Sequence, residues 1–304
     1  MPLGRRVRLR DGWRMGTVIA FVPASGGLGS STLAAAVAVR AAAASRSAVL
    51  VDLDPWGGPK DVLFGLEQEP GWRWPELSEV AGVVDGQGLA DELPMACGVP
   101  VLTSPGVAVA PAGGMPPGDD LDTRLATRPA TRPATRPATR PIGWLDGWLE
   151  TVPDVVAGLA DAHEVTVLDL PRDDRVLASV AVLVDAVVVL VGSQVPQLAA
   201  AAAVVPQLRC LLGSLREPVV RTWGDDPLLP IEPWVVLRGN RVESDLENLV
   251  IDQLDVPVVS TIGHDRTLGA EMHEGLPPGT RGRGAVVRAA DELLLRLVTQ
   301  SVAA

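Results

Sequence analysis

The stretch that most constrains the fold runs from Thr17 to Thr32 and reads TVIAFVPASGGLGSST. Its apolar start, Thr17–Val22, predicts a buried strand, and the alanine-rich segment Ser31–Ala44 predicts a helix. The glycine-rich turn between them would aim the first backbone N–H groups of the helix, and the positive end of its dipole, at one point. Such a point suits a phosphate, whereas the simpler alternative is a tight strand-to-helix turn.

The turn matches a phosphate-binding loop in shape but not in charge. The usual pattern is G-x-x-x-x-G-K-[ST], and this chain carries Ser30 at the lysine position. No other lysine is expected near the loop, because Lys60 is the only lysine in the chain. Ser31 and Thr32 supply hydroxyls that would either cap the helix or contact a magnesium ion.

Carboxylates follow two further apolar segments. Ala48–Leu53 predicts a central strand that ends in Asp52 and Asp54, and the later segment EVTVLDL ends at Asp169. Carboxylates at the carboxyl ends of parallel strands, beside a glycine loop, lie where open α/β sheets bind ligands. An aspartate in the place of Asp169 reaches the magnesium shell in phosphoryl-transfer sites, although it would alternatively cap the helix expected just downstream.

The remaining apolar patterns complete an alternation of strands and helices. Further strands are expected at Val99–Ser104, Ala186–Val191, Trp234–Leu237 and Val256–Val259, and further helices at Glu76–Val84, Trp144–Ala162, Val195–Leu215, Glu243–Leu254, Thr267–His273 and Ala285–Val302. The run Val176–Val191 is short for a membrane span and contains Asp185, so two segments of a buried parallel sheet explain it better. The alternation predicts an α/β fold, with a mostly parallel twisted sheet and helices on both faces.

Composition limits the class of protein. The chain has 304 residues and a formal net charge of -11, which argues against broad nucleic-acid binding. Cys97 and Cys210 form neither a disulfide framework nor a metal-binding spacing, so a reducing, cytoplasmic compartment is expected. Residues 1–16 are interpreted as a basic arm, and no apolar segment of a signal peptide follows their arginines.

One segment is unlike the rest of the chain. Residues 105–141 are rich in Pro, Ala and Arg and include a tandem A-T-R-P repeat from Ala126 to Pro141. Proline at every fourth position excludes a regular helix or a central strand. We therefore expect a disordered, solvated insertion in a single domain that spans residues 17–304. A repeat-expanded loop without a defined role is favoured over a basic tether to an acidic partner or to lipid headgroups.

Four motifs, SGGLGSST, VLVDLDPWGG, VTVLDLPR and VVLRGN, occur in an order and spacing that resemble the MinD/ParA family of deviant-Walker ATPases. The likeness is closest to the CpaE-like branch from pilus-assembly and secretion neighbourhoods, some actinobacterial members of which are called septum site-determining proteins. The resemblance implies a P-loop NTPase-like fold, ATP and Mg²⁺ as cofactors, and a homodimer. It also implies partners in pilus, secretion or septum machinery, which would recruit a cytoplasmic protein to the inner face of the membrane.

The resemblance also implies roles for individual residues. The phosphate loop would consist of Gly26, Gly27, Leu28, Gly29, Ser30, Ser31 and Thr32. Asn240 lies where the family often has an asparagine that contacts adenine. The magnesium ligands would be Ser31, Asp52 and Asp169, and the catalytic pair that places magnesium and the attacking water would be Asp52 and Asp54.

The chain departs from the family at both loop lysines, which are replaced by Ser25 and Ser30. Losing one cation aimed at the transferred phosphoryl group costs on the order of 3 kcal/mol of transition-state stabilisation. Hydrolysis is therefore expected to be slow or absent, and whether the chain is an enzyme stays open. Arg172 is a conceivable substitute cation. The main alternative is a non-enzymatic interaction scaffold that keeps the fold without nucleotide; a small-molecule kinase ranks last.

Overall fold

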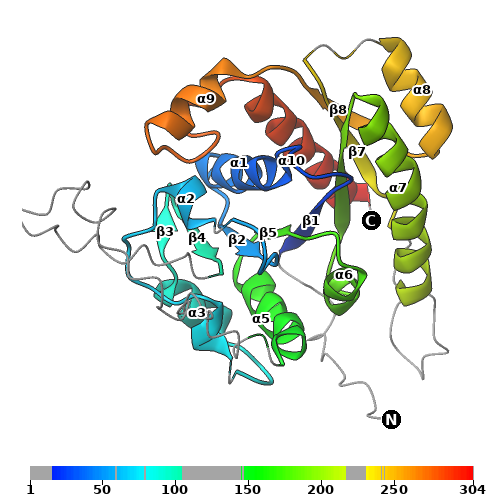
Figure 1. Cartoon of the computed structure of the whole chain (residues 1–304). Coiled ribbons are helices and arrows are strands. Elements are labelled where there is room, and N and C mark those ends of the chain that lie inside the picture. Colours follow the sequence, from blue (N-terminus) through cyan, green and yellow to red (C-terminus); the bar gives the residue numbers. More distant parts are fainter. Residues whose placement is uncertain are drawn as a thin grey trace, which may run out of the picture.

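The computed structural model describes residues 16–58, 60–78, 80–104, 145, 147–216, 231–240, 242 and 244–303. In this part of the chain, helices flank one twisted sheet (Figure 1). Most of the predicted basic arm, the predicted insertion at residues 105–141 and the loop that follows residue 216 lie outside the described residues.

The sheet is parallel except at one edge. Its strands are β1 (Thr17–Pro23), β2 (Ala48–Asp52), β3 (Met95–Ala96), β4 (Val99–Leu102), β5 (Val165–Asp169), β6 (Ala186–Gly192), β7 (Trp234–Arg238) and β8 (Val258–Ile262). They are ordered β3-β4-β2-β5-β1-β6-β7-β8, and only the β3–β4 pair is antiparallel. This arrangement confirms the predicted α/β fold with a mostly parallel sheet.

The helices divide between the two faces of the sheet (Figure 1). One face is covered by α1 (Ser30–Ala43), α2 (Asp61–Phe64), α9 (Arg266–His273) and α10 (Ala285–Ala303), and the other by the 3-10 turn η1 (Trp74–Leu77), α3 (Gly86–Glu92), α5 (Trp148–Ala162), α6 (Asp174–Val180), α7 (Val195–Arg216) and α8 (Ser244–Leu254). Because both faces are covered, the central strands read as nearly continuous apolar runs.

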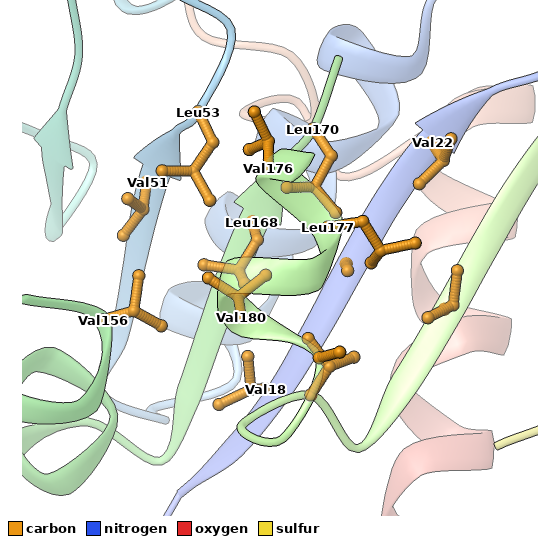
Figure 2. Close-up of a cluster of buried hydrophobic side chains, with 14 of the residues drawn as sticks. Val18, Val22, Val51, Leu53, Val156, Leu168, Leu170, Val176, Leu177 and Val180 are labelled. Atoms are coloured by element: carbon orange, nitrogen blue, oxygen red, sulfur yellow. The ribbon is translucent and has the colours of Figure 1, made fainter. Parts of the chain in front are cut away.

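Alternation along each strand separates two hydrophobic cores. In β1, Val18, Ala20 and Val22 face the α5–α6–α7 side, while Ile19 and Phe21 face α1. Figure 2 shows the first of these cores, where three residues of α6, Val176, Leu177 and Val180, lie over the central strands. The same alternation fixes the direction of the polar residues at the strand ends.

Two predictions about this side of the sheet are wrong. The segment Glu76–Val84 is not a helix. Instead, η1 covers only its first two residues and α3 begins after it, because Gly82 between them has a left-handed φ of 91° that an α-helix does not adopt. The run Val176–Val191 does not contain two strands, since its first part is the helix α6.

Helix α7 has a mean hydropathy of 1.6 and is the one helix among the described residues that is long and apolar enough to cross a bilayer. Its residues Ala201, Val205, Leu208 and Leu212 belong to the core beneath the sheet. In this structure α7 therefore serves as a covering helix of the sheet.

Candidate functional site

Two aspartates meet at the carboxyl end of the sheet. Asp52 on β2 lies directly opposite Asp169 on β5 in the parallel ladder. Their neighbours two residues earlier, Leu50 and Val167, belong to the core beneath α1, so alternation turns both carboxylates toward that helix. Asp52 is 0% and Asp169 is 2% exposed. The helix that follows is capped by Asp173, not Asp169, which removes the capping alternative for Asp169.

The glycine loop lies beside this pair, because Phe21 of β1 is the other neighbour of Asp169 in the sheet. Helix α1 follows Gly29, whose φ is 83° and which offers no side-chain cap. The first turn of α1 contains no acidic residue. Among the described residues, the buried hydroxyls of Ser25 and Ser30 have no hydrogen-bond partner. Free N–H groups and unpartnered hydroxyls together form a surface that suits an anion.

The predicted magnesium ligands come together. Burial raises the pKa of Asp169, and the Lys60 ammonium and then the Ser31 hydroxyl, in the first turn of α1, oppose this rise. Asp169 in turn lies opposite Asp52. The structure therefore brings Ser31, Asp52 and Asp169 together, and their role as magnesium ligands stays a prediction.

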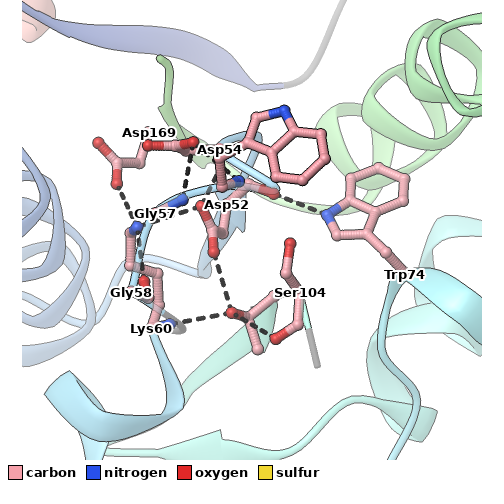
Figure 3. A network of polar contacts seen from close by, with 10 residues as sticks. Asp52, Asp54, Gly57, Gly58, Lys60, Trp74, Ser104 and Asp169 are labelled. Atoms are coloured by element: carbon pink, nitrogen blue, oxygen red, sulfur yellow. Dashed lines mark hydrogen bonds and ion pairs between the residues drawn. The ribbon is translucent and has the colours of Figure 1, made fainter. Parts of the chain in front are cut away.

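Lys60 lies between the two aspartates, so the expectation that no lysine approaches the loop is wrong (Figure 3). Its Nζ is 3.2 Å from Asp52 Oδ1 and 3.1 Å from Asp169 Oδ2. Nζ also donates a hydrogen bond to the carbonyl oxygen of Gly58, at 3.1 Å. Lys60 is only 3% exposed, so this ammonium group is enclosed by the protein.

The backbone of Lys60 is anchored to the same cluster. Its N–H donates to Thr103 Oγ1 at 2.9 Å, and the Thr103 hydroxyl donates to Asp52 Oδ2 at 3.0 Å. Beside them, the indole Nε1 of Trp74 donates to the Asp52 carbonyl oxygen at 2.6 Å (Figure 3). Hydrogen bonds therefore join the end of β2 at Asp52 to Lys60, Trp74 and Thr103.

Burial and charge compete in this cluster. The pKa of Asp52 is raised to about 7, chiefly by burial; the Lys60 ammonium opposes this rise and the Asp169 carboxylate adds to it. Burial alone lowers the pKa of Lys60, but its two carboxylate partners outweigh burial and raise it. Lys60 is thus held in its charged form by two acids that share a single ammonium group.

Asp54, the other predicted catalytic residue, is engaged in a turn. Its Oδ1 accepts hydrogen bonds from the N–H groups of Trp56 at 3.1 Å and Gly57 at 2.9 Å. Its own N–H donates to Asp52 Oδ1 at 3.1 Å. Asp54 is therefore positioned at the site through its backbone, and a catalytic role for its carboxylate stays a prediction.

Magnesium does not fit this arrangement while Lys60 keeps its place. Carboxylate and hydroxyl oxygens suit Mg²⁺ chemically. However, Asp52 and Asp169 each direct an oxygen at the ammonium group of Lys60. Elsewhere in the described part of the chain, no three His, Cys, Asp or Glu side chains gather in a way that would hold a metal ion.

A cleft of about 440 Å³ opens beside the glycine loop, within the size range of ligand pockets. Its lining brings Gly27 and Leu28 together with Arg238 and the predicted adenine contact, Asn240. The Arg238 guanidinium covers the loop so closely that a Cβ at Gly29 would lie 2.6 Å from its Nη1. Sequence reasoning overlooked Arg238, although its position at the end of strand β7 was the available signal.

Arg172 is not part of this cleft, since it is exposed and lines a separate small pocket beside α6 and α7. A larger hollow of about 970 Å³ lies between α9 and α10 and shares only His264 with the cleft. Its lining mixes acidic with basic side chains and contains none of the predicted site residues. The cleft at the glycine loop is therefore the candidate site.

Known proteins resemble this chain more in their fold than in their sequence. No family model matches the chain. An uncharacterized protein from two strains of Mycobacterium tuberculosis is 42% identical over 94 residues, which make up 31% of this chain and 26% of that protein. This chain thus matches about a quarter of the length of those relatives, and their description assigns no activity.

Solved structures with the same fold are MinD and ParA ATPases. A ParA family ATPase from Chlorobium tepidum has a TM-score of 0.60 at 15% identity, covering 90% of this chain and 97% of its own. The MinD of a MinC:MinD cell division complex from Aquifex aeolicus scores 0.55 at 15% identity, covering 92% and 96%. The septum site-determining protein MinD from Pyrococcus horikoshii, complexed with Mg-ADP, scores 0.57 at 14% identity, covering 91% and 96%. The chain therefore has the MinD/ParA P-loop NTPase fold.

Proposed function

We propose that this chain binds the phosphates of ATP at its glycine-rich loop and acts as a nucleotide-gated switch with slow or absent hydrolysis. The observation that carries the proposal is the cleft in which the loop, Arg238 and Asn240 meet. The uncapped start of α1 supplies backbone N–H donors there. Arg238 supplies a positive charge close to the loop, at the side of Gly29.

Slow hydrolysis is proposed because the cations that stabilise a transferred phosphoryl group are replaced. Ser25 and Ser30 occupy both lysine positions of the loop. The Asp54 carboxylate already accepts two backbone hydrogen bonds and is less available to orient water. Binding of ATP in the ground state needs only hydrogen-bond donors and positive charge. Phosphoryl transfer also needs groups that stabilise the charge that develops in the transition state.

The cellular role is proposed from the fold and from the motifs. A chain of this kind, acting as a homodimer in the cytoplasm, would position or regulate a pilus or secretion apparatus or the division septum. Its CpaE-like motifs favour the first and the MinD structures favour the second. Recruitment to the inner face of the membrane would take place through partner proteins, and no specific nucleic acid is expected as a partner.

The test is a calorimetric titration with ATP of the wild type, Arg238→Ala and Arg46→Ala. Charge-assisted hydrogen bonds contribute about 1.5–3 kcal/mol, so Arg238→Ala is expected to weaken ATP binding by roughly 10- to 100-fold. Arg46 is the matched control, because its exposed ion pair with Glu164 lies at the opposite end of the strands. Unchanged affinity in Arg238→Ala would contradict the assignment of Arg238.

The non-enzymatic scaffold is the second candidate, and the replaced loop lysines favour it. It predicts that the wild type binds no ATP at millimolar concentration. Under that outcome the cleft would be a remnant of the fold, and the partner surfaces would carry the function.

A further inference from the structure

We propose that Lys60 is a built-in cation that takes the place of a divalent metal ion between Asp52 and Asp169. The wild-type chain would then hold no metal there. The assignment starts from position, because Nζ lies 3.2 Å and 3.1 Å from oxygens of two of the three predicted metal ligands. It does not depend on whether the chain binds a nucleotide.

The ammonium group of Lys60 is enclosed by three oxygen atoms of the protein. A lysine ammonium has three N–H donors. Lys60 Nζ donates one hydrogen bond to the Gly58 carbonyl oxygen at 3.1 Å and forms ion pairs with Asp52 Oδ1 at 3.2 Å and Asp169 Oδ2 at 3.1 Å. A lysine that served the phosphates of a ligand would keep at least one donor free and some exposure to the cleft. Lys60 is only 3% exposed and its ammonium group pairs with two carboxylates, so it serves the carboxylates.

Both carboxylate oxygens of Asp52 also have partners within the protein. Its Oδ1 accepts from the Asp54 N–H and pairs with Lys60, while its Oδ2 accepts from Thr103. A metal ion would have to displace the ammonium group and compete with these donors. Buried carboxylates need a compensating charge, and Lys60 already supplies it from within the chain.

The segment that carries Lys60 is fixed at both ends. On its amino side, Thr103 Oγ1 accepts the Lys60 N–H. On its carboxyl side, Asp61 begins α2 and pairs with Arg73, with Nε 3.2 Å from Oδ2. The side chains of Asp61 and Arg73 are also largely buried, which protects the pair from solvent screening. The backbone therefore holds the lysine over the aspartates before any ligand arrives.

The test uses Mn²⁺ alone as the probe, with free Mn²⁺ measured by electron paramagnetic resonance. The wild type is expected to have no specific site. Lys60→Ala removes the ammonium group and opens its space, so it is expected to bind one Mn²⁺ at least tenfold more tightly than any non-specific binding by the wild type. Two controls accompany it: Lys60→Met fills the space without charge, and Lys60→Ala combined with Asp169→Asn removes a ligand. Neither is expected to bind.

Failure of Lys60→Ala to gain an Mn²⁺ site would overturn the proposal. Mn²⁺ binding is also compared between the wild type and Asp169→Asn. This comparison does not depend on the folding of a Lys60 variant. Equal, non-specific Mn²⁺ binding by both supports the built-in cation. A single Mn²⁺ site in the wild type that disappears in Asp169→Asn would show that the metal enters despite Lys60, and would also overturn it.

Discussion

Lys60→Met is expected to lower the free energy of unfolding by about 3–5 kcal/mol, because it leaves two buried carboxylates without their shared cation. Methionine keeps most of the volume of the side chain, so the loss would report charge and hydrogen bonding rather than a cavity. For a domain of this size the melting temperature would fall by roughly 10 °C. Urea unfolding followed by circular dichroism measures the change.

The matched control is Arg46→Met, which removes a cation from an exposed pair with Glu164. Exposed pairs contribute about 0–1 kcal/mol, so little change is expected. Asp169→Asn gives a second comparison, since it removes one of the two acids that share the ammonium and should cost much less than Lys60→Met. Equal effects of Lys60→Met and Arg46→Met would mean that the buried cluster contributes no more than a surface pair.

Trp74→Ala is expected to destabilise the protein by a similar amount, roughly 3–5 kcal/mol, through the cavity left by a large buried side chain. Trp74 is 1% exposed and its ring meets that of Trp148 edge to face, with centroids 5.6 Å apart. Its Nε1 also holds the carbonyl oxygen of Asp52 at the end of β2. The variant should therefore loosen the Asp52–Lys60 cluster as well as the core.

Trp56→Ala is the matched control for Trp74, because Trp56 lies in the loop after Asp54 but is 72% exposed. A change within about 0.5 kcal/mol is expected there. Trp74→Phe separates packing from hydrogen bonding, since it keeps a ring and loses the N–H donor; it should fall between the wild type and Trp74→Ala. If Trp74→Ala were as stable as Trp56→Ala, the indole would have no supporting role.

Much of this fold follows from periodicity and spacing. Strands β1, β2 and β5 are nearly continuous apolar runs, and both aspartates stand at the ends of such runs. Once neighbouring parallel strands are assumed, Asp52 and Asp169 must lie at one edge of the sheet. The glycine loop must then lie beside them, because it follows β1. Local pattern and sheet geometry were sufficient for this part of the site.

Lys60 and Arg238 could not be placed in the same way. Lys60 follows a turn rich in proline and glycine, and its direction depends on Thr103 and Arg73, which are distant in sequence. Arg238 reaches the loop only because β6 lies between β1 and β7 in the sheet. Side chains whose position depends on contacts distant in sequence leave no local pattern. Both residues are cations, so the sequence alone underestimates the positive charge at the site.

The error at Glu76–Val84 has a local origin. A helix cannot continue through Gly82, whose φ of 91° is left-handed, and α3 begins at Gly86 although glycine is a poor helix former. Glycine is required at that point because a Cβ on Gly86 would lie 1.8 Å from the carbonyl oxygen of Gly158 in α5. Close packing between helices thus overrides helix propensity there.

The central claim is that the cleft binds nucleotide phosphates at the glycine loop and Arg238 without a divalent metal ion, because Lys60 occupies the place between Asp52 and Asp169. Calorimetric titration of the wild type with ATP, once in excess Mg²⁺ and once in a chelator, tests it most directly. We predict saturable binding in the chelator that is at least as tight as in Mg²⁺. Binding that appears only when Mg²⁺ is present would contradict the claim, because nucleotide binding would then require a metal ion despite Lys60.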